Sequence, residues 1–225
     1  MLDNKVRLSY LVADLLFLGT AGGLIGIAIM TKNNMARPPT PDSVAENLLL
    51  MSSPVLGALI NAVLVLVAFF LSLPAIALSS TKIWLKIHGW AVLVCALFTL
   101  VLGLDIWFRT LQTRSNLSVL WGQQTDQTQS LLQQRFNCCG YLDAATPPFQ
   151  KDTACPSVLV AAQKLGCVGA FSSFANGYLD LIFTACFGVV ALDFILLLCV
   201  AMLLKQRDER ERYRHIDEKN GFGGI

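Results

Sequence analysis

The sequence is poor in charge. Asp, Glu, Lys and Arg make up only 14% of its 225 residues, against roughly 25% in typical soluble chains. The formal net charge of +2 is close to neutral, so the chain lacks the basic excess of a nucleic-acid-binding protein. Only two histidines occur, His88 and His215, and neither has the partner spacing of a nucleophile–base pair or a metal site. The composition therefore gives no support to an enzyme or to a nucleic-acid partner.

Apolar residues, in contrast, make up 55% of the chain. A chain this short cannot bury so many of them in a core of its own. In hydrocarbon an open segment must be helical to pair its backbone amides, and about 20 residues cross a bilayer. The first apolar run exceeds the 7–15 residue core typical of a signal peptide, so we expect it to be an uncleaved span. Four runs qualify and predict an all-α membrane four-helix bundle: 8–30, 55–78, 87–108 and 179–204.

Lys and Arg near the span ends set the expected orientation. They are dense in residues 1–7, 79–86 and 205–225, which we place in the cytoplasm with both histidines at that side or boundary. Residues 31–54 and 109–178 then face outside. The first of these loops contains Arg37-Pro38-Pro39-Thr40-Pro41, which predicts no fold of its own. The charged tail, 205–225, is expected to extend the fourth span as a solvated helix.

The long outer loop holds four of the seven cysteines, and an even number on the oxidising side predicts two disulfides. Bonding of adjacent cysteines is strained, which leaves a nested and a crossed pairing open. Zinc is disfavoured because the spacing lacks paired Cys-x-x-Cys. The four are Cys138, Cys139, Cys155 and Cys167.

The rest of that loop predicts a small, mainly helical head. Residues 109–136 contain no proline and predict a stalk helix rising from span three, and a short helix is expected near Ser157–Lys164. Asn116 begins the one N-glycosylation sequon, on the side assigned outside.

The run Phe136-Asn137-Cys138-Cys139-Gly140-Tyr141 resembles the Cys-Cys-Gly signature of tetraspanins, and it lies in the same loop. Cys167 and Cys155 match the last and middle loop cysteines of that family, although Asp152 replaces the proline of its usual Pro-x-x-Cys. Span number, loop sizes and tail lengths also match. The resemblance implies the nested pairing, Cys138–Cys167 with Cys139–Cys155, and Gly140 is expected to form a turn with positive φ.

The resemblance also implies a function. Tetraspanins are non-enzymatic organisers that bind other membrane proteins laterally through the large loop and gather them into microdomains. The expected location is the plasma membrane or an endosomal or vacuolar membrane. Membrane lipids are expected partners, and a homo-oligomer stays open. The short four-cysteine loop further resembles fungal tetraspanins needed for appressorium-mediated host penetration. No cofactor is expected apart from a sterol in an intramembrane cavity, for which this chain lacks the family's acid in span three.

Polar residues within the spans are costly in lipid and are expected to face the bundle, either lining a pocket or pairing between helices. They are Asp14, Asn61 and Asp193. The alternative function is a small ion or solute transporter or channel that uses Asp14 and Asp193 as ligands. A claudin is disfavoured because claudins carry their large loop between the first two spans.

Three further features have alternative interpretations. The small residues of span one are expected to pack against a small-and-polar set on span two rather than form a dimer seam. Cys199 and the deeper Cys95 are palmitoylation candidates, with a buried free thiol as the alternative. Tyr213 and Ile216 fit an endocytic Tyr-x-x-bulky sorting motif. The small residues are Gly19, Gly22, Gly23 and Gly26 on span one and Gly57, Ala58, Asn61 and Ala62 on span two.

Overall fold

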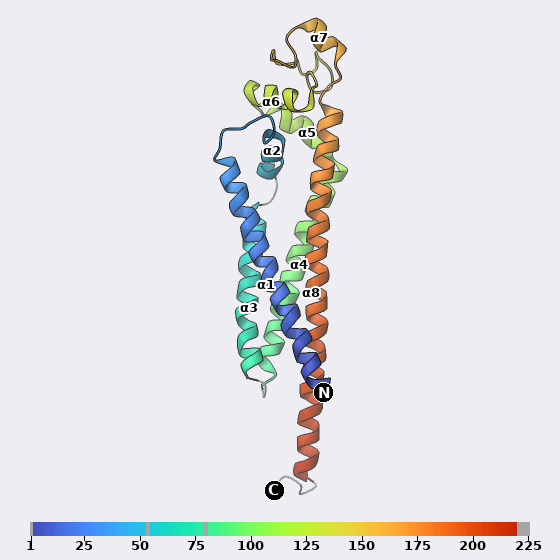
Figure 1. Ribbon diagram of the computed structural model, residues 1–225. Coiled ribbons are helices and arrows are strands. Elements are labelled where there is room, and N and C mark those ends of the chain that lie inside the picture. Colours follow the sequence, from blue (N-terminus) through green and yellow to red (C-terminus); the bar gives the residue numbers. More distant parts are fainter. Residues whose placement is uncertain (1, 53–54, 79–80, 220–225) are drawn as a thin grey trace. The chain divides into compact units, whose positions relative to one another are not determined.

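The computed structural model describes residues 2–52, 55–78 and 81–219, and every regular element in them is an α-helix (Figure 1). Of the helices described, four are long and apolar enough to cross a membrane, so the chain is a multi-pass membrane protein. Each contains one of the predicted spans to within a residue, which confirms the all-α membrane fold. The four are α1 (Leu2–Met35), α3 (Val55–Ala77), α4 (Ile83–Leu111) and α8 (Val168–Lys219).

The chain folds into two compact units, which we call the bundle unit and the head unit. The bundle unit takes its described residues from Met1–Gly26, Leu56–Val101 and Cys186–Ile225, and hence from the four long helices. The head unit takes its residues from Ile27–Val55 and Leu102–Ala185. It includes four short helices: α2 (Val44–Ser52), α5 (Thr113–Gly122), α6 (Asp126–Phe136) and α7 (Val158–Gln163).

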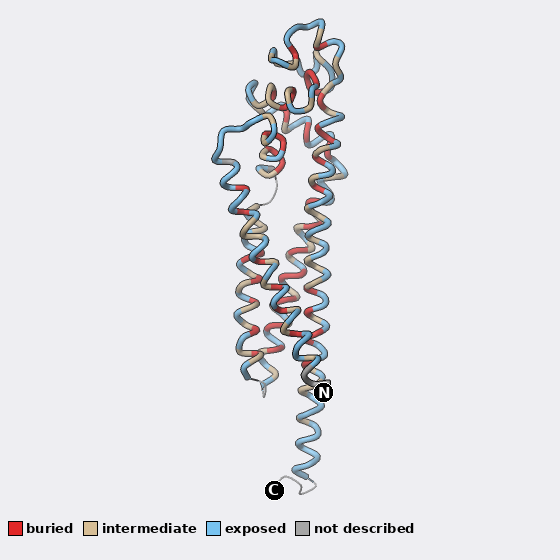
Figure 2. Tube along the Cα trace, viewed as in Figure 1, coloured by how far each residue is buried: buried red, intermediate tan, exposed pale blue. Residues whose placement is uncertain are grey.

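Buried residues recur every three or four positions along the helices of the bundle unit, as expected for helices with one inward face (Figure 2). Exposed positions between them are largely apolar, which suits contact with lipid. The core combines residues from all four helices: Tyr10, Phe17 and Ala21 of α1; Val65, Ala68 and Ala75 of α3; Leu85, Val92 and Cys95 of α4; and Leu196, Cys199, Val200 and Leu203 of α8.

The glycines of α1 do not face this core, so the predicted close packing of α1 on α3 through them is wrong. Gly19, Gly22 and Gly23 are exposed, and nothing lies within 4 Å of a Cβ atom built on any of them. The inward positions are instead the fully buried Phe17 and Ala21. The helix has small residues on more than one side, and the shape of the partner helices decides which side turns inward.

The predicted helical extension of span four is confirmed, because α8 continues to Lys219. Its charged part holds the short connection between α3 and α4. Arg207 donates hydrogen bonds to the carbonyl oxygens of Ala75 at 2.7 Å and Thr81 at 2.8 Å. Lys82 forms ion pairs with Asp208 and Glu211, and its hydrogen bonds to these two carboxylates raise the pKa of its ammonium group.

The loop before α3 has more structure than its prolines predicted. Residues 44–52 form α2, which packs against α6 and buries four side chains in the head core. Arg135 of α6 also forms an exposed ion pair with Asp42, just before α2, at 2.6 Å. The prolines end at Pro41, and the sequence after them is amphipathic, so the prediction of an unstructured loop is wrong. The buried side chains are Val44, Ala45, Leu48 and Leu49.

Residues 109–136 are mostly helical, as predicted, but they do not form a single stalk helix, because the chain breaks twice. α4 ends at Leu111, and a second break separates α5 from α6. Gly122 ends α5, and the Thr125 side chain caps α6 by accepting a hydrogen bond from the Thr128 amide. The expected short helix near Ser157–Lys164 is confirmed as α7, with Ser157 as its N-cap.

Candidate functional site

The head unit is crosslinked by two disulfides, Cys138–Cys167 and Cys139–Cys155. This is the nested pairing that the family resemblance implies. The two bonds close loops with sequence separations of 29 and 16 residues. In the chain-entropy model they contribute about 3.6 and 3.1 kcal/mol to stability. The crosslinks therefore add to the apolar packing that holds the shape of the head.

Each disulfide belongs to a different core. Cys138 and Cys167 are buried with side chains of α2, α5, α6 and α8, including Trp121 and Phe171. Cys139 and Cys155 share a much smaller core with Ala161 of α7. The position of α7 therefore depends on the second disulfide more than on apolar packing.

Gly140 forms the turn that follows the paired cysteines, with φ of +72°, as predicted. A Cβ atom at this position would overlap the Asp143 carbonyl oxygen, so only glycine fits. The carbonyl oxygen of Gly140 accepts a hydrogen bond from the Cys167 amide at 3.0 Å. The turn thus aligns the two ends of the head loop beside the first disulfide.

Gln133 is a central residue of the head that sequence analysis missed. It is fully buried, and its Oε1 accepts hydrogen bonds from the amides of Gly140 and Gln150, both at 3.1 Å. Its Nε2 donates to the Gln150 carbonyl at 2.8 Å and to Asp152 Oδ2 at 2.9 Å. A buried amide with all these partners fixes one geometry. The sequence feature that could have revealed this buried amide is a glutamine beside the apolar stripe of α6, about one turn before the paired cysteines.

Asp152 stands where the resemblance leads one to expect a proline, and the structure gives it a role. Its Oδ1 accepts hydrogen bonds from the amides of Ala154 at 2.8 Å and Cys155 at 2.7 Å. A carboxylate that accepts from the following amides forms an Asx turn. This turn sets the approach of Cys155 to Cys139 without a proline ring.

Tyr141 joins the turn to α5. Its hydroxyl donates to the Arg114 carbonyl oxygen at 2.9 Å, and its ring lies 5.5 Å from that of Trp121. Burial raises the pKa of the Tyr141 hydroxyl. The phenol therefore stays protonated and keeps its hydrogen bond over the physiological pH range.

Around α7 the head exposes large apolar side chains. Val158 is 70% exposed, Leu159 79% and Leu165 87%. Lys164, between them, is fixed by hydrogen bonds from its Nζ to Asn137 Oδ1 at 2.6 Å and to the Ala154 carbonyl at 2.7 Å. The result is an apolar surface on a rigid, crosslinked support, which we call the α7 surface (Val158, Leu159 and Leu165).

The bundle unit contains a separate polar cluster. Asp14 of α1 is buried, as predicted, and accepts a hydrogen bond from Ser72 of α3 at 2.6 Å. His88 of α4 lies 3.6 Å from the other carboxylate oxygen, donates from Nδ1 to the Ala68 carbonyl oxygen at 3.0 Å, and is packed edge-on by Tyr10. The cluster joins three spanning helices.

The burial of His88 was missed by the sequence analysis, which placed both histidines in the cytoplasm or at its boundary. The ring is fully buried. It lies one helical turn inside α4, near the end of an apolar run, so its sequence position resembles a boundary site. Its partner Asp14 is remote in sequence, and local patterns do not reveal such a pair.

Asn61 and Asp193 are buried as predicted, but they do not join Asp14. Asn61 donates to Thr99 Oγ1 at 2.8 Å, and Thr99 donates to the Cys95 carbonyl at 2.9 Å. Asp193 has no hydrogen-bond partner among the described residues. Two of the three polar residues therefore pair between helices, which favours a structural role over a shared polar pocket.

The remaining candidate residues take different positions. Cys95 and Cys199 are buried in the bundle core, which favours the buried free thiol over palmitoylation at both positions. Tyr213 and Ile216 are exposed on α8. Asn116 is exposed on α5 and available for glycosylation.

No family model, curated protein or solved structure matches the chain.

Proposed function

We propose that the protein is a tetraspanin-type membrane organiser, which binds other membrane proteins laterally through its head and assembles them into microdomains. The observation that carries the proposal is the α7 surface. Its apolar side chains are 70–87% exposed although the segment is held by a disulfide and by the hydrogen bonds of Lys164. Exposed apolar side chains on a rigid support are what a protein-binding surface requires.

The proposed orientation places both termini in the cytoplasm and residues 109–178 outside, in the plasma membrane or an endosomal or vacuolar membrane. Arg207 and Lys82, which hold the connection between α3 and α4, are then cytoplasmic. This agrees with the usual enrichment of Lys and Arg on that side. Two disulfides in the outer segment fit an oxidising compartment. A role in appressorium-mediated host penetration rests on the resemblance alone, and infection assays with a deletion strain test it.

The organiser is proposed to be non-enzymatic. The alternative of a transporter with Asp14 and Asp193 as ion ligands has less support. Asp14 is engaged by Ser72 and His88, and no described interaction joins it to Asp193. A shared ion site needs both carboxylates on one ion.

The test is crosslinking in the native membrane followed by isolation in mild detergent. We expect Leu159→Ser with Leu165→Ser to lose most of the crosslinked membrane proteins, because both substitutions remove apolar area from the α7 surface. Gln163→Ser, at an exposed polar position of α7, is the matched control and should keep them. Retention of the partners by the double variant, together with ion flux from the purified protein in liposomes, would favour the transporter.

A further inference from the structure

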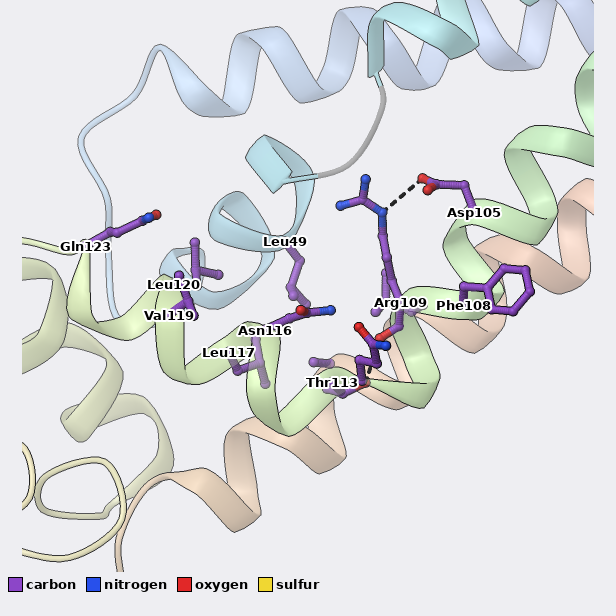
Figure 3. Close-up of a pocket in the computed structure, with 13 residues that line it drawn as sticks. Leu49, Asp105, Phe108, Arg109, Thr113, Asn116, Leu117, Val119, Leu120 and Gln123 are labelled. Atoms are coloured by element: carbon purple, nitrogen blue, oxygen red, sulfur yellow. Dashed lines mark hydrogen bonds and ion pairs between the residues drawn. The ribbon is translucent and has the colours of Figure 1, made fainter.

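The head unit contains a cleft of about 520 Å³, lined by α2, α5 and the adjoining parts of α4 and α8 (Figure 3). Its volume falls in the range of small-ligand sites, about 300–1,000 Å³. Leu49, Leu117 and Leu179 give it apolar walls, and each of these side chains is less than 8% exposed. The cleft thus has an apolar wall, while Gln112, Asn116 and Gln123 give it polar sides.

An ion pair lies at the rim of the cleft. Arg109 Nε donates to Asp105 Oδ2 at 2.9 Å, and about half of each side chain is exposed (Figure 3). Exposed i,i+4 pairs of this kind contribute little to stability. The pair also gives the cleft one positive and one negative group with no net charge.

The position of this ion pair along α4 indicates its depth relative to the membrane. The apolar run of α4 ends here, and Trp107 and Phe108 are exposed beside it. Aromatic side chains at the end of a spanning helix mark the level of the lipid headgroups. The cleft therefore opens where phospholipid headgroups are the most concentrated small molecules.

We propose that the cleft binds the headgroup of a zwitterionic phospholipid, phosphatidylcholine or phosphatidylethanolamine, from the adjacent leaflet. The guanidinium of Arg109 has five donors in a planar fork that matches a phosphate while it also pairs with a carboxylate. Asp105 meets the ammonium group, and the glycerol and first acyl carbons lie along Leu49 and Leu179. Since the ion pair has no net charge, the site favours a neutral headgroup over an anionic one. The proposal requires only the membrane fold and is independent of the organiser function.

The test is lipid binding to the delipidated full-length protein, measured by native mass spectrometry, with phosphatidylcholine and phosphatidylglycerol as probes. We expect one phosphatidylcholine to bind more tightly than phosphatidylglycerol. Arg109→Gln should weaken it about tenfold or more, as expected for loss of a charge-assisted phosphate contact. Asp105→Asn should weaken phosphatidylcholine and strengthen phosphatidylglycerol. Arg214→Gln removes an exposed i,i+4 cation outside the cleft and should change neither.

A second pair of variants separates cleft occupancy from charge. Asn116 is exposed and lines the cleft. Asn116→Phe fills the cleft and should abolish tight phosphatidylcholine binding, whereas Asn116→Gln should retain it. Both remove the sequon, so glycosylation does not separate them, and helical content and non-reducing mobility confirm folding. Equal phosphatidylcholine affinity in wild type, Arg109→Gln and Asn116→Phe, or stronger binding of phosphatidylglycerol by the wild type, would overturn the proposal.

Discussion

Removing the Cys139–Cys155 disulfide should release α7 while leaving the rest of the head folded. The perturbation is Cys139→Ala with Cys155→Ala, which avoids leaving a buried hydroxyl. The bond closes a loop with a sequence separation of 16 residues, worth about 3 kcal/mol in the chain-entropy model. Among the described residues, Ala161 is the one other side chain fully buried in this core, and Ala144, Phe149 and Ala154 are only partly buried against it, so little packing compensates for the lost crosslink.

That free energy corresponds to about two orders of magnitude in the local opening equilibrium. Amide hydrogen exchange of the full chain in detergent should therefore accelerate about 100-fold at α7. At α6 exchange should change little, because α6 packs in the larger core that holds Cys138–Cys167. Cys186→Ala, which removes a free thiol of α8, is the control and should leave both helices unchanged. Unchanged protection at α7, or an equal loss at α6, would refute this division of the head.

Three further predictions concern other parts of the chain. Ser72→Ala removes the donor to buried Asp14 and should lower the stability of the bundle by about 1–3 kcal/mol, measured by unfolding in detergent; an unchanged midpoint contradicts the proposed hydrogen bond. Asn116→Gln should remove one glycan and increase gel mobility, whereas a wild type insensitive to deglycosylation contradicts modification there. Lys82→Gln removes two ion pairs to α8 and should increase amide hydrogen exchange over residues 205–211. Equal exchange in the variant and the wild type at low salt would show that these ion pairs do not order the tail.

The spans and the presence of two disulfides in the head could be predicted from the sequence because their signals are local, whereas the nested pairing was implied by the family resemblance. A run of about 20 apolar residues has few structures open to it in lipid. The glycine after the paired cysteines indicated a turn, and Gly140 has the expected positive φ. The burial of Asp14, Asn61 and Asp193 followed from the cost of polar groups in hydrocarbon.

The errors and the missed features arose where the outcome depends on a distant partner. Helix α1 has small residues on more than one side, and the shapes of the neighbouring helices decide which side packs against them. Phe17 rather than Gly19 is buried. His88 is buried because Asp14 and Ala68 supply partners from two other helices. Two other errors had a local signal that we did not use. The capping residue Thr125 marks the start of α6, but the apolar stripe suggested that the helix runs on. The amphipathic run of α2 predicts a helix, but the prolines before it suggested a loop.

The most direct test of the central claim compares partner capture by the wild type and by Cys139→Ala with Cys155→Ala in the same membrane. The amount of crosslinked membrane protein per chain is the measured quantity. If the crosslinked head binds partners through the α7 surface, the variant should lose most of them while remaining inserted and helical. Equal capture by the two proteins would contradict the account.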